Sequence, residues 1–216
     1  ARTVVSSATK DVVIGDGGSL TVTNSTFSAN SAGDAGGAIF SDSASTLNFN
    51  TFDANTASPG ASVYYVGYNK TLTEDNNIFS LGTASDAASG ACDSDTPVSG
   101  GFSLTTGAGC PGTLVSDTDL DLQTLADNGG PTKTHLPQAG SPVIDAGDPG
   151  FAAPPSTDQR GYARVSGGRI DMGAVESGSG ALPPTGGSNG LMATIGAGLL
   201  ALGGALHLTG RRKRTV

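Results

Sequence analysis

The sequence predicts an all-β protein, a parallel β-helix (a solenoid) that ends in an irregular cap. Composition is the first observation: 34 of the 216 residues are glycine and only 5% are aromatic, which suits a fold whose turns each bury few side chains. Alternation of apolar and polar residues, as in Leu20-Thr21-Val22, is the second and is typical of strands. The third is an internal period of about 25 residues, which indicates stacked repeats.

The period is visible in two series of segments. Residues 22–30 match residues 47–55, and residues 72–80 are a looser third copy with one inserted residue. A second apolar series follows the same spacing, at residues 12–14, 38–40 and 62–64. Each unit is therefore expected to hold two or three short strands separated by turns.

Aligned positions in the two series predict the repeat core. Phe27 falls on Phe52, and we expect the two rings to stack inside the solenoid. Asn30 falls on Asn55, and we expect an internal ladder in which each side-chain amide bonds the next coil. Ile39, in the second series, is predicted to be a core residue as well.

Two short motifs alternate along these repeats. Residues 27–30 and 52–55 read FxxN, and residues 36–39 read GGAI. This alternation resembles the repeats of polymorphic outer-membrane proteins. The resemblance implies a right-handed parallel β-helix over about residues 12–80. The third copy departs from the pattern, since it has neither a clean FxxN nor a GGAI.

A second set of motifs lies between Leu125 and Glu176. In order, the chain reads LADNGGPT, SPVIDAGD, DQRG and DMGAVE. This series resembles the terminal region of the choice-of-anchor surface proteins of the Q type, although the segment at 132–140 is short. We expect a polar cap here that closes the open strand edge of the solenoid. Its expected pairs join the acidic residues Asp145, Asp148, Asp158 and Asp171 to Arg160, Arg164 and Arg169.

The two cysteines, Cys92 and Cys110, are predicted to form a disulfide. An even count in a chain with an export-type tail favours this pairing, and two free buried thiols are the alternative. In the chain-entropy model such a bridge contributes about 3 kcal/mol. A metal site is not expected, because His135 and His207 lie far away in the sequence.

The C-terminus has three elements in a fixed order. They are the pentapeptide Leu182-Pro183-Pro184-Thr185-Gly186, an uncharged segment at 191–209, and the basic run at 211–214. The uncharged segment would span roughly 28 Å as a helix, close to the thickness of a bilayer core. We therefore predict a single transmembrane helix with a cytoplasmic basic tail.

This order resembles the LPxTG-type cell-wall sorting signal of Gram-positive bacteria. The resemblance implies that a sortase cleaves between Thr185 and Gly186 and transfers the protein to peptidoglycan. Sortase and peptidoglycan are thus the expected partners, and the membrane is contacted only before processing. The alternative is a plain C-terminal membrane helix with a chance pentapeptide upstream.

These features predict five segments. They are coils at 1–80, terminal coils and cap at 81–176, a linker with the sorting motif at 177–190, the transmembrane helix at 191–209 and the basic tail at 210–216. Because such a tail requires export and the chain begins with Ala1 rather than a signal peptide, we expect the gene product to begin further upstream.

Charge narrows the function classes. All 19 acidic residues but only seven of the 11 basic residues precede Gly186, so we do not expect nucleic acid as a partner. We predict a non-enzymatic, wall-anchored display protein, with adhesion to host or cell-surface glycans or proteins inferred from fold analogy. The alternative is a polysaccharide lyase or glycosidase whose catalytic coils lie upstream of this chain.

No catalytic residue is predicted in this chain. Asp16 and Asp42 are interpreted as turn residues, with calcium binding as the alternative. Asp145 and Asp148 are given a hydrogen-bonding role, again with metal binding as the alternative. His135 has no acid or nucleophile partner that the sequence identifies, and we expect it to be structural or exposed.

Overall fold

Within the residues that the structure describes, the chain forms two parallel β-sheets with very little helix, in agreement with the predicted all-β class. The computed structural model describes residues 4–6, 12–14, 18–67, 70–81, 90–95 and 98–178. The first sheet comprises β1 (Val4–Ser6), β3 (Ser19–Ser28), β5 (Ala44–Asp53), β7 (Leu72–Asp75), β8 (Ile78–Ser80), β10 (Val98–Gly100), β11 (Leu104–Thr105) and β12 (Thr113–Leu114). The second comprises β2 (Val12–Ile14), β4 (Ile39–Ser41), β6 (Val63–Tyr65) and β9 (Cys92–Ser94).

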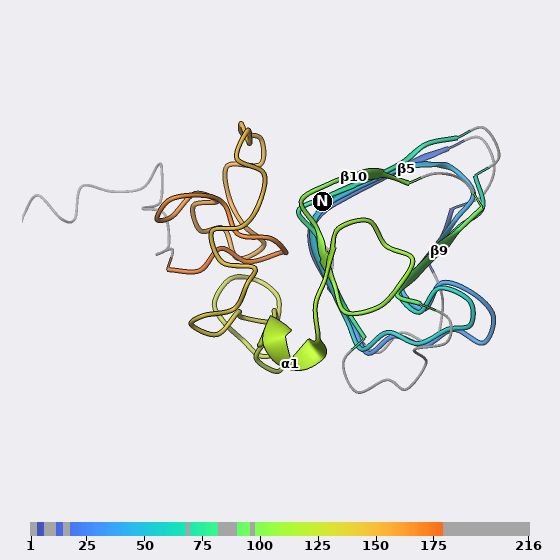
Figure 1. Cartoon of the computed structure of the whole chain (residues 1–216), viewed down its shortest axis with the longest axis horizontal. Helices are drawn as coiled ribbons and strands as arrows, with labels where there is room; N and C mark the ends of the chain where they lie inside the picture. The colour runs from blue at the N-terminus through green and yellow to red at the C-terminus, as the bar shows by residue number, and fades with distance from the viewer. Residues whose placement is uncertain are drawn as a thin grey trace, which may run out of the picture. The chain divides into compact units, whose positions relative to one another are not determined.

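Strands of successive repeats pair in parallel, one repeat apart. Phe27 of β3 lies opposite Phe52 of β5, which lies opposite Phe79 of β8. In the second sheet, Ile39 of β4 lies opposite Val63 of β6. Figure 1 shows strands of successive repeats overlying one another, with β5 and β10 on one side of a ring of chain and β9 on another. The two sheets therefore curl around a shared interior.

A left-handed backbone residue bends each repeat of the first sheet. Asn24 in β3, Phe49 in β5 and Asn76 after β7 have φ angles of 52°, 57° and 55°. Successive side chains alternate in a regular strand, so Val22 and Phe27 would face opposite sides. Both instead belong to the same buried cluster. The bend thus lets both arms of a long strand contribute to one interior.

Glycine sets the turn that leads into the second sheet. Gly36 before β4 and Gly60 before β6 have φ angles of 69° and 68°. A Cβ atom at Gly36 would lie 2.3 Å from the carbonyl oxygen of Ile39, so a side chain fits neither the conformation nor the space. The GGAI motif therefore corresponds to a tight turn followed by a buried strand.

Both sheets contribute to one apolar interior. The rings of Phe27, Phe52 and Phe79 stack with 4.9 Å between neighbouring centroids and 8° between planes. Ile39 and Val63, on the second sheet, belong to the same cluster and are each 1% exposed. A stack of this kind buries large side chains at a single repeating position, which suits a chain with few aromatic residues.

The parallel sheets continue beyond Ser80, where the repeat is no longer visible in the sequence. β9 extends the second sheet, with Cys92 opposite Val63. β10 and β11 extend the first sheet, with Val98 opposite Leu72 and Leu104 opposite Ile78. β12 pairs with β11 and ends the series, and its Leu114 is 66% exposed.

The C-terminal region, residues 115–178, is mostly irregular and contains one short helix, α1 (Asp117–Leu120). It packs on the outer face of the first sheet, through a second apolar cluster of Ile78, Leu104, Leu120, Val143 and Met172. The predicted cap was expected to cover the open strand edge. Its contacts instead lie across the face of the sheet, because outward side chains such as Ile78 need an apolar cover there.

The predicted transmembrane helix at 191–209 lies outside the described residues. Within the described part of the chain, no helix has the length and apolar character needed to span a bilayer.

Candidate functional site

The motifs of the C-terminal region meet the outer face of the first sheet along one ladder of aligned residues, Thr26, Thr51, Ile78 and Leu104. The Thr26 hydroxyl lies 2.6 Å from Gln159 Oε1. The Thr51 hydroxyl accepts a hydrogen bond from the Ala174 N–H at 3.0 Å. Because both threonines are buried, these bonds satisfy groups that would otherwise be costly to cover.

Arg164 joins the C-terminal region to the bend of the first two long strands. Its guanidinium donates to Asn24 Oδ1 and to the carbonyl oxygens of Gly173 and Ala174. It also lies over the Phe49 ring, 4.3 Å from the centroid. Burial lowers the pKa of Arg164 to about 10, so the side chain is charged at neutral pH. Because Arg164 is 0% exposed, this cation is interpreted as a structural contact and not as a binding group for an external ligand.

A second buried network fastens the DQRG and DMGAVE motifs to each other. Asp158 Oδ2 lies 2.8 Å from Arg160 Nη2, and the same guanidinium group donates to the Glu176 carbonyl oxygen at 2.6 Å. The Glu176 carboxylate accepts the N–H groups of Ser166 and Asp171, each at 2.9 Å. Burial raises the pKa of Glu176 to about 7. The Asp158–Arg160 ion pair is one of the Asp–Arg pairs expected in the cap.

The other predicted aspartates bind backbone groups. Asp145 Oδ1 accepts the N–H groups of Arg169 and Gly168, which lower the pKa of its carboxyl. Asp171 accepts from the N–H groups of Asp145 and Ser177, and burial raises its pKa. These carboxylates hold turns together.

Metal binding was also the alternative for Asp148, Asp42 and Asp16. Asp148 Oδ1 accepts the Gly150 N–H at 2.7 Å, a local turn bond. The hydroxyl of Ser43 donates to Asp42 Oδ1 at 3.2 Å, while Asp16 lies outside the described residues.

His135 has partners that the sequence does not reveal. Its Nδ1 lies 2.8 Å from the Gln123 carbonyl oxygen, and its Nε2 lies 3.0 Å from the Ser28 hydroxyl. A carbonyl oxygen only accepts, so Nδ1 carries the proton and, in the neutral ring, Nε2 accepts from Ser28. Asp53 Oδ2 lies 3.6 Å from the same Nε2. Ser28 and His135 are 6% and 5% exposed, and we interpret the pair as a structural contact.

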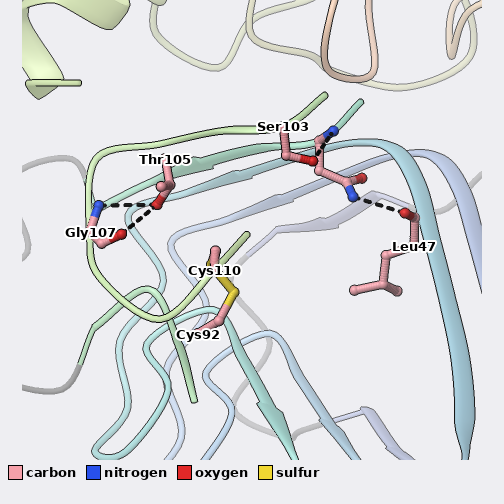
Figure 2. Close-up of a disulfide and its surroundings, with 7 residues drawn as sticks. Leu47, Cys92, Ser103, Thr105, Gly107 and Cys110 are labelled. Atoms are coloured by element: carbon pink, nitrogen blue, oxygen red, sulfur yellow. Dashed lines mark hydrogen bonds between the residues drawn. A yellow bond between two sulfur atoms is a disulfide. The ribbon is translucent and has the colours of Figure 1, made fainter. Parts of the chain in front are cut away.

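Two ladders of buried asparagines run along the repeats. The predicted one has Asn30 Nδ2 donating to Asn55 Oδ1 at 2.9 Å. The second joins Asn50 to Asn77, whose Oδ1 accepts both the Asn50 side chain and its backbone N–H. The Asn77 side chain also donates to the Leu47 carbonyl oxygen, and the Asn77 backbone N–H donates to the Ser103 hydroxyl on the next repeat. Figure 2 labels these two partners, Ser103 and Leu47, and draws the hydrogen bonds that they accept as dashed lines.

The predicted disulfide is confirmed: Cys92 in β9 is bonded to Cys110 in the loop after β11 (Figure 2). Beside it lies Glu74, a residue that the sequence analysis did not single out. One Glu74 oxygen and the two sulfur atoms all lie within 4.8 Å of one another. In the disulfide the sulfurs are not thiolates, so this group is not a metal site in its oxidised form.

Among the predicted site residues, Phe27, Ile39, Phe52, Asn30 and Asn55 all lie in the buried interior of the repeats. The sorting pentapeptide at 182–186 lies outside the described residues. The sequence did not indicate that Glu74 lies beside the disulfide, that Arg164 bonds Asn24, or that His135 bonds Ser28. For Glu74 a signal existed, because an acid stands where the aligned repeats have Val22 and Leu47.

Comparisons of the chain with protein-family models, with curated proteins and with solved structures find no match.

Proposed function

We propose that this chain is the C-terminal part of a surface-display protein that a sortase attaches to peptidoglycan. The observation that carries the proposal is the order of elements at the C-terminus: LPPTG at 182–186, an uncharged segment at 191–209 and a basic run at 211–214. An apolar segment followed by basic residues halts export with the pentapeptide outside the membrane. Pro183 and Pro184 keep that pentapeptide extended, the form in which a peptidase-like groove binds a substrate.

The displayed part is, in this proposal, a right-handed parallel β-helix. Two observations support it: successive strands pair in parallel one repeat apart, and each repeat leaves the first sheet, adds a strand to the second and returns. Crossover connections between parallel strands are right-handed in about 98% of cases. Long stacks of this kind suit a role in which a rigid body projects from the cell and contacts other cells or surfaces.

Cell-wall fractionation tests the anchoring step. In cells that express the intact gene, we expect the wild-type protein in the wall fraction, resistant to boiling in detergent and released by peptidoglycan hydrolase. Thr185→Ala should shift it to the membrane fraction or the medium, since the Thr185 side chain is part of the pentapeptide that the sortase must recognise before it attacks the adjoining backbone carbonyl. Thr209→Ala, the same change outside the pentapeptide, is the control and should leave the protein in the wall. A Thr185→Ala protein still bound to the wall contradicts the proposal.

A further inference from the structure

Glu74 is a buried acid at a position that is apolar in the neighbouring repeats. In the first sheet it lies opposite Leu47, which lies opposite Val22. Glu74 is 0% exposed, and among the residues that the structure describes neither of its carboxyl oxygens has a hydrogen-bond partner. Burying such a group without a partner costs free energy, and exceptions of this kind are often found at functional sites.

The disulfide beside Glu74 is unequally exposed. Cys92 is 3% exposed, whereas Cys110 is half-buried in the loop after β11. Both cysteines line a pocket of about 350 Å³, together with Asp93, Val98 and Pro111. This volume falls within the usual range of small-molecule sites. The disulfide thus has an unpartnered carboxyl on its buried side and an open pocket at Cys110.

We propose that Cys92–Cys110 is an exchange-active disulfide that reacts with small thiols at Cys110, and that Glu74 protonates the departing sulfur of Cys92. An incoming thiolate attacks Cys110 Sγ, the bond to Cys92 breaks, and its electron pair passes to Cys92 Sγ. The Glu74 carboxyl then gives its proton to that sulfur. The products are a mixed disulfide at Cys110, a thiol at Cys92 and a carboxylate at Glu74.

The titration of Glu74 agrees with this role. Burial, with a smaller contribution from Asp75, raises the pKa of Glu74 to about 8. The carboxyl is therefore protonated at neutral pH, and its pKa lies near the ordinary thiol value of about 8.5. A proton donor works best when its pKa lies near those of the operating pH and of the group that it serves. Without a donor, the thiolate of Cys92 would be left in an apolar interior.

Reduction by glutathione tests the proposal on the full, disulfide-intact chain. Samples are quenched with iodoacetamide, and peptide mass mapping locates the glutathione adduct. We expect the adduct on Cys110. At neutral pH, Glu74→Gln should slow the reaction at least about tenfold, the lower range for loss of a general acid. The rate per glutathione thiolate in the wild type should fall as pH rises through about 8.

Asp75→Asn is the matched control: it removes the adjacent charge on β7, which makes only the smaller contribution to the pKa of Glu74, and it should slow the reaction far less than Glu74→Gln does. An adduct on Cys92, equal rates for the wild type and Glu74→Gln, or no reduction without denaturant would each overturn the proposal and leave the disulfide as a structural crosslink. Circular dichroism checks that Glu74→Gln folds. If that variant does not fold, the site of the adduct and the wild-type pH profile still decide the question.

Discussion

At the scale of single residues, the fold depends on polar side chains that are buried and bonded over long sequence distances. Arg164 reaches Asn24 and Gln159 reaches Thr26, and in each pair more than 130 residues separate the partners. Each bond adds about 1 kcal/mol when made, but leaving a buried partner unpaired costs more. The DQRG motif and the arginine that follows it therefore act as attachment points for the C-terminal region.

Arg164→Ala is expected to destabilise the fold strongly. It removes bonds to Asn24, Gly173 and Ala174 and the contact with the Phe49 ring. Because two buried carbonyls and one amide lose their partner, we expect a loss of about 3 kcal/mol or more. Urea unfolding followed by circular dichroism measures it. Arg169→Ala, at an exposed arginine, is the control with an expected loss below about 1 kcal/mol, and equal losses for the two variants would contradict the assignment.

At the scale of elements, aromatic and asparagine ladders hold successive strands in register. Asn77 is the best-connected member, since it bonds Asn50, the Leu47 carbonyl and Ser103. These bonds sit at the bend that follows Asn76, where the backbone leaves regular strand geometry. The ladder thus supplies hydrogen bonds where the sheet cannot.

Asn77→Ala should loosen this bend across three repeats. The Asn50 N–H and the Leu47 carbonyl would be left unpaired, and we expect a loss of about 2–4 kcal/mol. Hydrogen exchange should show faster exchange of the Asn50 amide in particular. Asn48→Ala, at a half-buried position of β5, is the matched control. Unchanged protection at Asn50 in the Asn77 variant would show that the ladder does not maintain the register.

The sequence predicted those parts of the fold that repeat at a constant shift. Phe27 and Phe52 are the same residue at equivalent positions, so the stack and its register could be anticipated. The Asn50–Asn77 ladder was not, because the shift grows from 25 to 27 residues at this pair, whereas the sequence suggested one inserted residue. In addition, the residues that continue the ladder on either side are serines, Ser25 and Ser103. The attachment of the C-terminal region was also missed, since contacts such as His135 with Ser28 join segments that share no periodicity.

At the scale of the whole molecule, two buried acids make the stability of the fold depend on pH. Burial raises the pKa of Glu74 to about 8 and that of Glu176 to about 7, above the ordinary glutamate value of about 4.3. Between these values the folded chain binds more protons than the unfolded chain. The contribution of these two acids to stability is therefore fully present below the ordinary glutamate pKa of about 4.3 and is lost as pH rises through about 7 and 8.

Glu74→Gln should remove most of this loss, because no described residue donates a hydrogen bond to Glu74 whereas the Glu176 carboxylate accepts two backbone N–H groups. Each unit by which the pKa is raised costs roughly 1.4 kcal/mol once the acid ionises, so the variant should gain a few kcal/mol over the wild type near pH 8–9 and little near pH 4–5. Urea unfolding across this range measures the difference, and Asp75→Asn controls for removal of one nearby charge. A wild-type stability that is flat between these limits, or an equally steep fall in Glu74→Gln, would show that Glu74 is ionised at neutral pH in the folded chain.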